Sequence, residues 1–196
     1  MHNKTFLITG GNQGLGLDLT RHFNGTSVSR STGHNIVDNK DAIAKLSLDY
    51  DVFINNAYDG VFGQGRTEYG QAQLLNEVAM TWQQHDKTGH IISIGGVGSE
   101  DCGPPSPGWE SYNANKAALK HQSQQWTQAF KSSLVSFKTT VLTVDRLDTP
   151  VGRQRPTWTG NGVDSDQLIN MITLCLNSKH NTCVGEIVVW VNLDHK

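Results

Sequence analysis

Two residues four positions apart, Tyr112 and Lys116, form the pair in this sequence best suited to proton transfer. They begin the longest helical pattern of the chain, which runs from Ser111 to about Phe130. Residues four apart lie on one face of a helix, so the Lys116 ammonium is expected beside the Tyr112 phenol. A nearby cation favours the phenolate and lowers the phenol pKa from its ordinary value of about 10. The pair is a candidate general acid/base, although a surface tyrosine near a lysine has the same pattern.

A glycine-rich stretch at residues 9–16, with the letters TGGNQGLG, is the second feature that points to a ligand. It follows the apolar run 6–8 and precedes leucines at helical spacing. Such a turn between strand and helix binds phosphate, because glycines let the backbone approach and free N–H groups at the helix start attract anions. A glycine turn with a purely structural role is the alternative. The residues expected around the phosphates are Gly10, Asn12, Gln13, Gly14, Leu15 and Gly16.

Alternating strand and helix patterns predict how these features are brought together. Continuous apolar runs are typical of strands buried on both faces of a parallel sheet, and helices recur between them. We predict one domain over residues 1–196, an α/β three-layer Rossmann fold whose seven-stranded, mainly parallel sheet has helices on both faces. The seven expected strands are 5–8, 26–29, 34–37, 52–54, 89–94, 138–144 and 185–191.

Together, these motifs resemble those of the short-chain dehydrogenase/reductase family over nearly the whole chain. TGGNQGLG resembles the family fingerprint TGxxxGxG, and residues 112–116 match the active-site motif YxxxK. A third motif resembles the family's NNAG, with Tyr58 in its last position, and consists of Asn55, Asn56 and Ala57. The resemblance implies that Tyr112 is the general acid/base, and that Lys116 adjusts its charge and holds the nicotinamide ribose.

The sequence after the second expected strand bears on which nicotinamide cofactor binds. A Rossmann fold that binds NAD usually carries an acid here for the ribose hydroxyls, but this chain has Arg30 between Ser29 and Ser31. A guanidinium suits a 2′-phosphate, which favours NADP(H) over NAD(H); an exposed surface arginine is the alternative. Asp38 follows the third expected strand, where the family lets a carboxylate touch the adenine amino group, and ordinary turn chemistry explains it equally well.

The family's catalytic serine has no unambiguous equivalent in this chain. By strand register its position is Gly96, whereas the family's usual separation from Tyr112 gives Ser99. We assign Ser99 to the catalytic set with Tyr112 and Lys116. Ser93 is a further candidate, and either serine also has the alternative of bonding only to backbone.

Two further motifs of the family, its relay asparagine and its PGxxxT motif, have no full match in this chain. The asparagine of the family's proton relay is absent where counting back from the next strand places it, at residues 67–70, so Thr67 and Asn76 are the candidates. After the sixth expected strand the family reads PGxxxT. Residues 144–145 replace the proline and glycine, while Thr149 matches the threonine that bonds the nicotinamide carboxamide.

Composition excludes several classes of protein. Lys+Arg 16 against Asp+Glu 18 gives a net charge of −2, and the basic residues are scattered, so we expect no nucleic-acid partner. No apolar run approaches the roughly 18 residues of a membrane span, and no leader precedes the first strand, so we expect a cytoplasmic protein without a membrane partner. The 3 cysteines and 8 histidines lack metal-ligand spacing, so we expect no metal.

The resemblance implies an NADP-dependent oxidoreductase that transfers a hydride between nicotinamide and a small carbonyl or alcohol substrate. It also implies a homodimer or homotetramer paired through the helix that carries Tyr112. Two alternatives stay open. One is a dinucleotide-binding protein of the same fold without turnover, which Gly96 and the missing asparagine favour. The other is a related epimerase-type enzyme that holds NAD tightly.

Overall fold

The structure, a computed structural model, describes residues 4–58, 69–97, 110–150, 152–154, 158 and 160–191. In these residues six strands form one parallel sheet in the order β2-β1-β3-β4-β5-β6. The strands are β1 (Phe6–Thr9), β2 (Thr26–Val28), β3 (Val52–Asn55), β4 (Gly89–Ile94), β5 (Phe137–Val144) and β6 (Glu186–Val189). The helices are α1 (Gly14–His22), α2 (Lys40–Ser47), α3 (Gly70–Gln84), α4 (Glu110–Lys131) and α5 (Ser165–Leu176), with short 3-10 helices η1 (Arg30–Thr32) and η3 (Gly152–Gln154).

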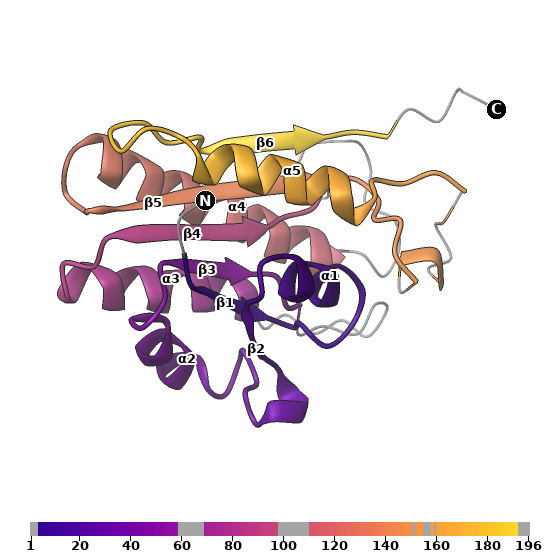
Figure 1. Cartoon of the computed structure of the whole chain (residues 1–196), viewed down its shortest axis with the longest axis horizontal. Helices are drawn as coiled ribbons and strands as arrows, with labels where there is room; N and C mark the ends of the chain where they lie inside the picture. Colours follow the sequence, from indigo (N-terminus) through magenta and orange to yellow (C-terminus); the bar gives the residue numbers. More distant parts are fainter. Residues whose placement is uncertain are drawn as a thin grey trace.

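Helices cover both faces of the sheet, which gives the three layers that the sequence predicts (Figure 1). Helices α1 and α5 lie on one face, and α2, α3 and α4 lie on the other. Successive residues of a strand point to opposite faces. Accordingly, Phe53 packs in the core under α2, α3 and α4, whereas its neighbour Ile54 packs in the core under α1 and α5.

The strand predicted at residues 34–37 is wrong, and these residues form a turn before α2. Asn35 explains the difference, because its side chain bonds within the turn. Its Oδ1 accepts from the Val37 backbone N at 3.0 Å, and its Nδ2 donates to Asp38 Oδ2 at 2.7 Å. Short polar side chains that bond locally in this way compete with strand pairing. The described sheet therefore ends at β2 on this side and has six strands, not seven.

A histidine is buried in β4, an inner strand of the sheet, near the amino end of that strand. His90, the second residue of β4, is 4% exposed, and its Nε2 lies 2.8 Å from Thr140 Oγ1. Burial, helped by the charge of Lys138, lowers the pKa of His90 from 6.5 to about 3. The imidazole is therefore neutral in the folded protein at neutral pH, while it titrates freely in the unfolded chain.

This burial predicts a dependence of stability on pH. Between pH 6.5 and about 3 the unfolded chain binds the His90 proton and the folded protein does not, so the free energy of unfolding falls as the pH is lowered through this window. We expect His90 to contribute a slope of about 1 kcal/mol per pH unit. Urea unfolding at several pH values measures it. His90→Gln should remove the slope, whereas the exposed control His121→Gln should keep it.

Candidate functional site

A cavity of about 570 Å³ opens at the carboxyl ends of the strands. It lies at the point where the chain, having run from β1 outward to β2, returns to β3 on the other side of β1. Ligands of open α/β sheets bind at such a switch point, and small-molecule pockets typically measure roughly 300–1,000 Å³. The cavity wall includes the turn after β1, the segment after β2, the ends of β3 and β4, and part of α4.

The glycine turn lies against this cavity. Its lining members include all six expected residues, Gly10, Asn12, Gln13, Gly14, Leu15 and Gly16. Gly10 has a φ of +72°, and a Cβ on Gly16 would lie 2.1 Å from the Gly10 carbonyl oxygen. Helix α1 begins at Gly14 without a side-chain cap, so the N–H groups of its first turn face the cavity end as donors for an anion.

The Asn-Asn-Ala motif at the end of β3 has two separate functions in the structure. Asn56 bonds to the glycine turn, since its Nδ2 donates to the Thr9 carbonyl at 3.0 Å, and Asn56 and Ala57 both line the cavity. Asn55 is fully buried and is not among the cavity residues. Its Nδ2 instead donates to the Gln71 carbonyl at 2.9 Å, which ties β3 to the start of α3.

Arg30 lies at the β2 end of the cavity, and Ser29 and Ser31 flank it in the sequence. It begins η1, directly after β2, and lines the cavity together with Ser29 and Ser31. Asn12 Nδ2 donates to both serine hydroxyls, at 2.8 Å to Ser29 Oγ and in a short bond to Ser31 Oγ. Asp38 lies in the turn before α2, with its carboxylate bonded by Asn35, and is not among the cavity residues.

Tyr112 and Lys116 lie side by side at the other end of the cavity. Lys116 Nζ is 5.5 Å from the centroid of the Tyr112 ring, as expected for residues four apart on α4. The lysine side chain is buried, and its ammonium donates to Gln71 Oε1 at 2.7 Å and to the Ile94 carbonyl at 2.9 Å. Two neutral oxygens thus hold the cation next to the phenol.

The Tyr112 hydroxyl occupies the space beside Gly96. A Cβ on Gly96 would lie 2.6 Å from Tyr112 Oη, so the phenol hydroxyl occupies the place that any larger residue would need. Ser99, the serine that we assigned to the catalytic set, lies outside the described residues. Ser93 is buried within β4 and does not line the cavity.

Two residues that the sequence analysis missed contact the Tyr112–Lys116 pair. Tyr58 lines the cavity, with its ring edge-on to Tyr112 at a centroid distance of 5.1 Å and with Lys116 Nζ 5.6 Å from its centroid. Gln71 is the amide acceptor described above. Its signal in the sequence is a polar side chain on the apolar face of a helix, at positions i, i+3, i+4 and i+7 with Leu74, Leu75 and Val78.

The structure describes one of the two candidates for the family asparagine. Thr67 lies outside the described residues. Asn76 is in the middle of α3, its Nδ2 donates to Met80 Sδ at 3.3 Å, and it does not line the cavity. Within the described residues, the amide that bonds Lys116 belongs to Gln71.

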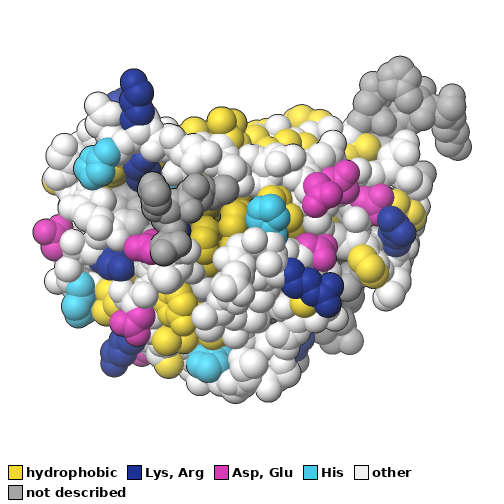
Figure 2. Space-filling model, viewed as in Figure 1, with side chains coloured by type: hydrophobic (Ala, Val, Ile, Leu, Met, Phe, Trp, Pro, Cys, Tyr) yellow, Lys and Arg dark blue, Asp and Glu magenta, His cyan; other side chains and the backbone are white. Residues whose placement is uncertain are grey.

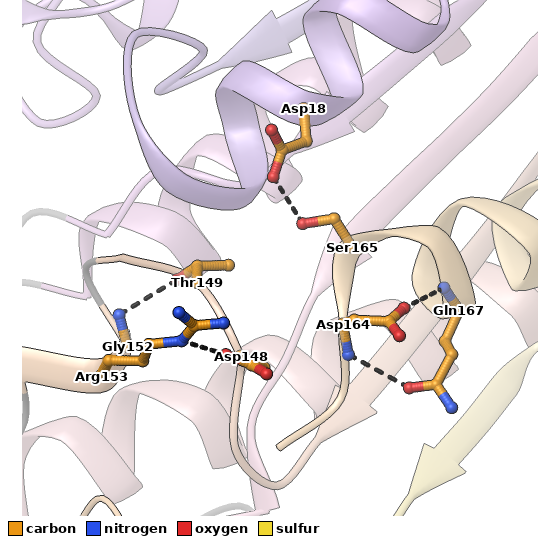
Figure 3. Close-up of polar contacts among 8 residues, drawn as sticks. All are labelled: Asp18, Asp148, Thr149, Gly152, Arg153, Asp164, Ser165 and Gln167. Atoms are coloured by element: carbon orange, nitrogen blue, oxygen red, sulfur yellow. Dashed lines mark hydrogen bonds and ion pairs between the residues drawn. The ribbon is translucent and has the colours of Figure 1, made fainter. Parts of the chain in front are cut away.

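The loop after β5 carries Thr149 to the cavity. Thr149 Oγ1 accepts from the Gly152 backbone N at 3.0 Å, and Arg153 Nε pairs with Asp148 Oδ1 in the same turn (Figure 3). Further along, the start of α5 is tied to α1 by a bond of 2.6 Å from Ser165 Oγ to Asp18 Oδ2. The turn therefore holds the Thr149 side chain, which is 4% exposed, at the cavity wall.

The described residues also bear on membrane insertion and metal binding. None of their helices is long and apolar enough to span a membrane, and no group of three or more His, Cys, Asp or Glu side chains is arranged to hold a metal ion. On the face that Figure 2 shows, lysines and arginines are dispersed among acidic side chains instead of forming a continuous basic patch.

Dehydrogenases and reductases are among the solved structures that resemble this chain. A 3-ketoacyl-(acyl-carrier-protein) reductase from Brucella melitensis complexed with NADH has a TM-score of 0.76 and 16% identity, with 95% of this chain and 96% of that chain covered. A short-chain dehydrogenase from Burkholderia cenocepacia in complex with NADP has a TM-score of 0.74 and 16% identity, with 96% and 88% covered. An acetoin dehydrogenase from Salmonella typhimurium has a TM-score of 0.67 and 14% identity, with 95% and 94% covered.

These likenesses establish that the chain has the fold of the short-chain dehydrogenases/reductases. By sequence, no protein-family model and no curated protein matches it.

The close approach of Gly16 to the Gly10 carbonyl allows a direct test of how tightly the glycine turn is packed. In Gly16→Ala the added methyl group must push aside the Gly10 carbonyl, which a Cβ would meet at 2.1 Å. Overpacking of this kind costs roughly 1–3 kcal/mol, and the displaced backbone belongs to the cavity wall. We expect a lower free energy of unfolding in urea. Unchanged stability would contradict the close packing of the turn.

Proposed function

We propose that the chain is a member of the short-chain dehydrogenase/reductase family and that it transfers a hydride between a nicotinamide dinucleotide and a small carbonyl or alcohol substrate. The observation that carries the proposal is the shared cavity: a bare glycine turn lines one side, and a tyrosine paired with a buried lysine lines the other. Neither motif alone is specific, but the fold brings both to the switch point of the sheet.

The residues present fit a nicotinamide dinucleotide. Gly16 lets α1 pack against the Gly10 carbonyl, and the glycine turn lines the cavity where a pyrophosphate would lie. The start of α1 would supply N–H donors there. Lys116 would hold the nicotinamide ribose, and Thr149 would bond the carboxamide. When bound, the nicotinamide supplies or accepts the hydride.

Tyr112 would perform the proton transfer. In the direction of reduction, its hydroxyl donates a proton to the substrate oxygen as negative charge develops there. The phenolate that remains is stabilised by the Lys116 ammonium, which lies 5.5 Å from the ring centroid. In the direction of oxidation the same phenolate accepts the proton of the alcohol. Ser99 stays our candidate for the second hydroxyl at the substrate.

The surroundings of Arg30 support a preference for NADP(H). The arginine and the hydroxyls of Ser29 and Ser31 line one end of the cavity, and Asn12 bonds both hydroxyls. A guanidinium with adjacent hydroxyl donors matches a phosphate monoester, which accepts several charge-assisted hydrogen bonds. We further propose, from the family resemblance, that the protein pairs through α4 as a homodimer or homotetramer.

A second candidate function is dinucleotide binding without turnover. It is favoured by Gly96, where strand register places the family's serine, because the Tyr112 hydroxyl fills the space in which a side chain at this position would lie.

Tyr112→Phe separates the two functions. The variant keeps the ring and loses the proton donor, so we expect NADPH affinity within about threefold of the wild type. We expect at least about a hundredfold lower kcat with a mixed panel of aldehydes, ketones and quinones, because acid–base catalysis contributes roughly 10²–10⁴-fold. If wild type and variant both bind NADPH and neither oxidises it with any panel member, the binding function replaces the enzymatic one.

Arg30→Gln tests the cofactor preference. Loss of a charged partner costs about 1.5–3 kcal/mol, which corresponds to at least a tenfold weaker NADPH complex, while NADH affinity should stay within about twofold. Fluorescence titration with each cofactor measures both affinities. Arg21→Gln, an exposed arginine at the end of α1, is the matched control and should change neither. Tighter binding of NADH than of NADPH by the wild type would refute the preference.

A further inference from the structure

Gln71 is a buried polar residue that lies behind the cavity and contacts three elements. It is the second residue of α3 and is 0% exposed. Its Nε2 donates to the Asn55 carbonyl at 2.8 Å and to the Ile94 carbonyl at 3.1 Å, at the ends of β3 and β4. Because both acceptors face the NH₂ group of the amide, its oxygen has to face the other way, toward Lys116 on α4.

We propose that Gln71 is a positioning residue of this site, whose neutral amide fixes the Lys116 ammonium against Tyr112 without cancelling its charge. The inference rests on the proposed function, because that function gives Tyr112 its part in proton transfer.

The contacts around the ammonium form a closed triangle. Lys116 Nζ donates to Gln71 Oε1 at 2.7 Å and to the Ile94 carbonyl at 2.9 Å, and that same carbonyl accepts from Gln71 Nε2. A free lysine side chain has about 2 kcal/mol of rotamer entropy, so an ammonium with one partner would not keep one position. Two acceptors that are themselves joined fix its distance from the Tyr112 ring.

The choice of an amide has an electrostatic consequence. Gln71 Oε1 and the Ile94 carbonyl are both uncharged, so they hold the ammonium while its positive charge still acts on Tyr112. A glutamate at position 71 would bind the ammonium at least as strongly, but its negative charge would offset the field at the phenol. The other described titratable or charged groups that line the cavity are Tyr58, Asp145, Arg30 and His34.

Asn55 supports this arrangement from the side away from the cavity. Its Nδ2 donates to the Gln71 backbone carbonyl, and its own carbonyl accepts from the Gln71 side chain. Two reciprocal bonds thus clamp Gln71 to the end of β3. The first asparagine of the Asn-Asn-Ala motif therefore acts on the site through Gln71 and Lys116, since it does not line the cavity itself.

The test is an ultraviolet titration of tyrosinate on the protein without cofactor, which needs no substrate. The chain has only 4 tyrosines, so Tyr112→Phe identifies the titration that belongs to Tyr112. Gln71→Met removes the amide, and Gln71→Glu keeps its size and its acceptor oxygen while adding a charge. The matched controls are Gln84→Met and Gln84→Glu, at an exposed glutamine near the end of the same helix.

We expect the Tyr112 titration to move to higher pH by at least about one unit in Gln71→Glu, and also to higher pH in Gln71→Met, since the cation is offset in the first and released in the second. Gln84 variants should titrate like the wild type. If Gln71→Met does not fold, Gln71→Glu still decides the question. An unchanged Tyr112 titration in the folded Gln71 variants would overturn the proposal, because a purely structural glutamine lowers the melting temperature alone.

A double-mutant cycle checks that the effect passes through the lysine. In a Lys116→Met background, Gln71→Met should shift the Tyr112 titration by less than about 0.3 unit, because the cation that it positions is gone. A full shift in that background would refute the route through Lys116. The outcome is separable from the proposed function: a wild type that fails to bind NADPH refutes the function, and the titration is read without it.

Discussion

The buried ammonium of Lys116 is the constraint on which the site depends. Moving a lysine charge out of water is costly unless the ammonium is hydrogen-bonded. The folded chain therefore needs acceptors around the buried ammonium. Those acceptors come from two elements, the Ile94 carbonyl at the end of β4 and the Gln71 side chain at the start of α3. These bonds join α4, which carries the Tyr112 phenol, to the end of β4 and the start of α3.

The opposite wall of the cavity is determined by close backbone packing instead of charge. A side chain at Gly16 would collide with the Gly10 carbonyl, and Asn56 reaches from β3 to the Thr9 carbonyl. These contacts join β1, α1 and β3 around the turn, and the turn lines the cavity. A closely packed glycine turn and the Tyr112–Lys116 pair therefore line the same cavity, and the proposed dinucleotide site rests on that arrangement.

Sequence patterns were reliable where one physical cause controlled the outcome. The apolar strand runs, the glycine turn and the i, i+4 pair each follow from local geometry, and the structure has them where they were expected. The expectation at residues 34–37 was wrong because four residues with two apolar side chains fit a strand and a turn equally well. There the Asn35 side chain decided between them through bonds to Val37 and Asp38.

The sequence by itself determined the layered α/β fold and the identity of the Tyr112–Lys116 pair, since periodicity and spacing along one chain encode both. Only the tertiary structure decided which residues surround that pair. Gln71 lies 45 positions from Lys116, and Asn55 faces away from the cavity although Asn56 faces it. Contacts of this kind depend on how two helices and two strand ends meet. The local pattern marks Gln71 only as a polar residue on an apolar helix face and does not identify its partner.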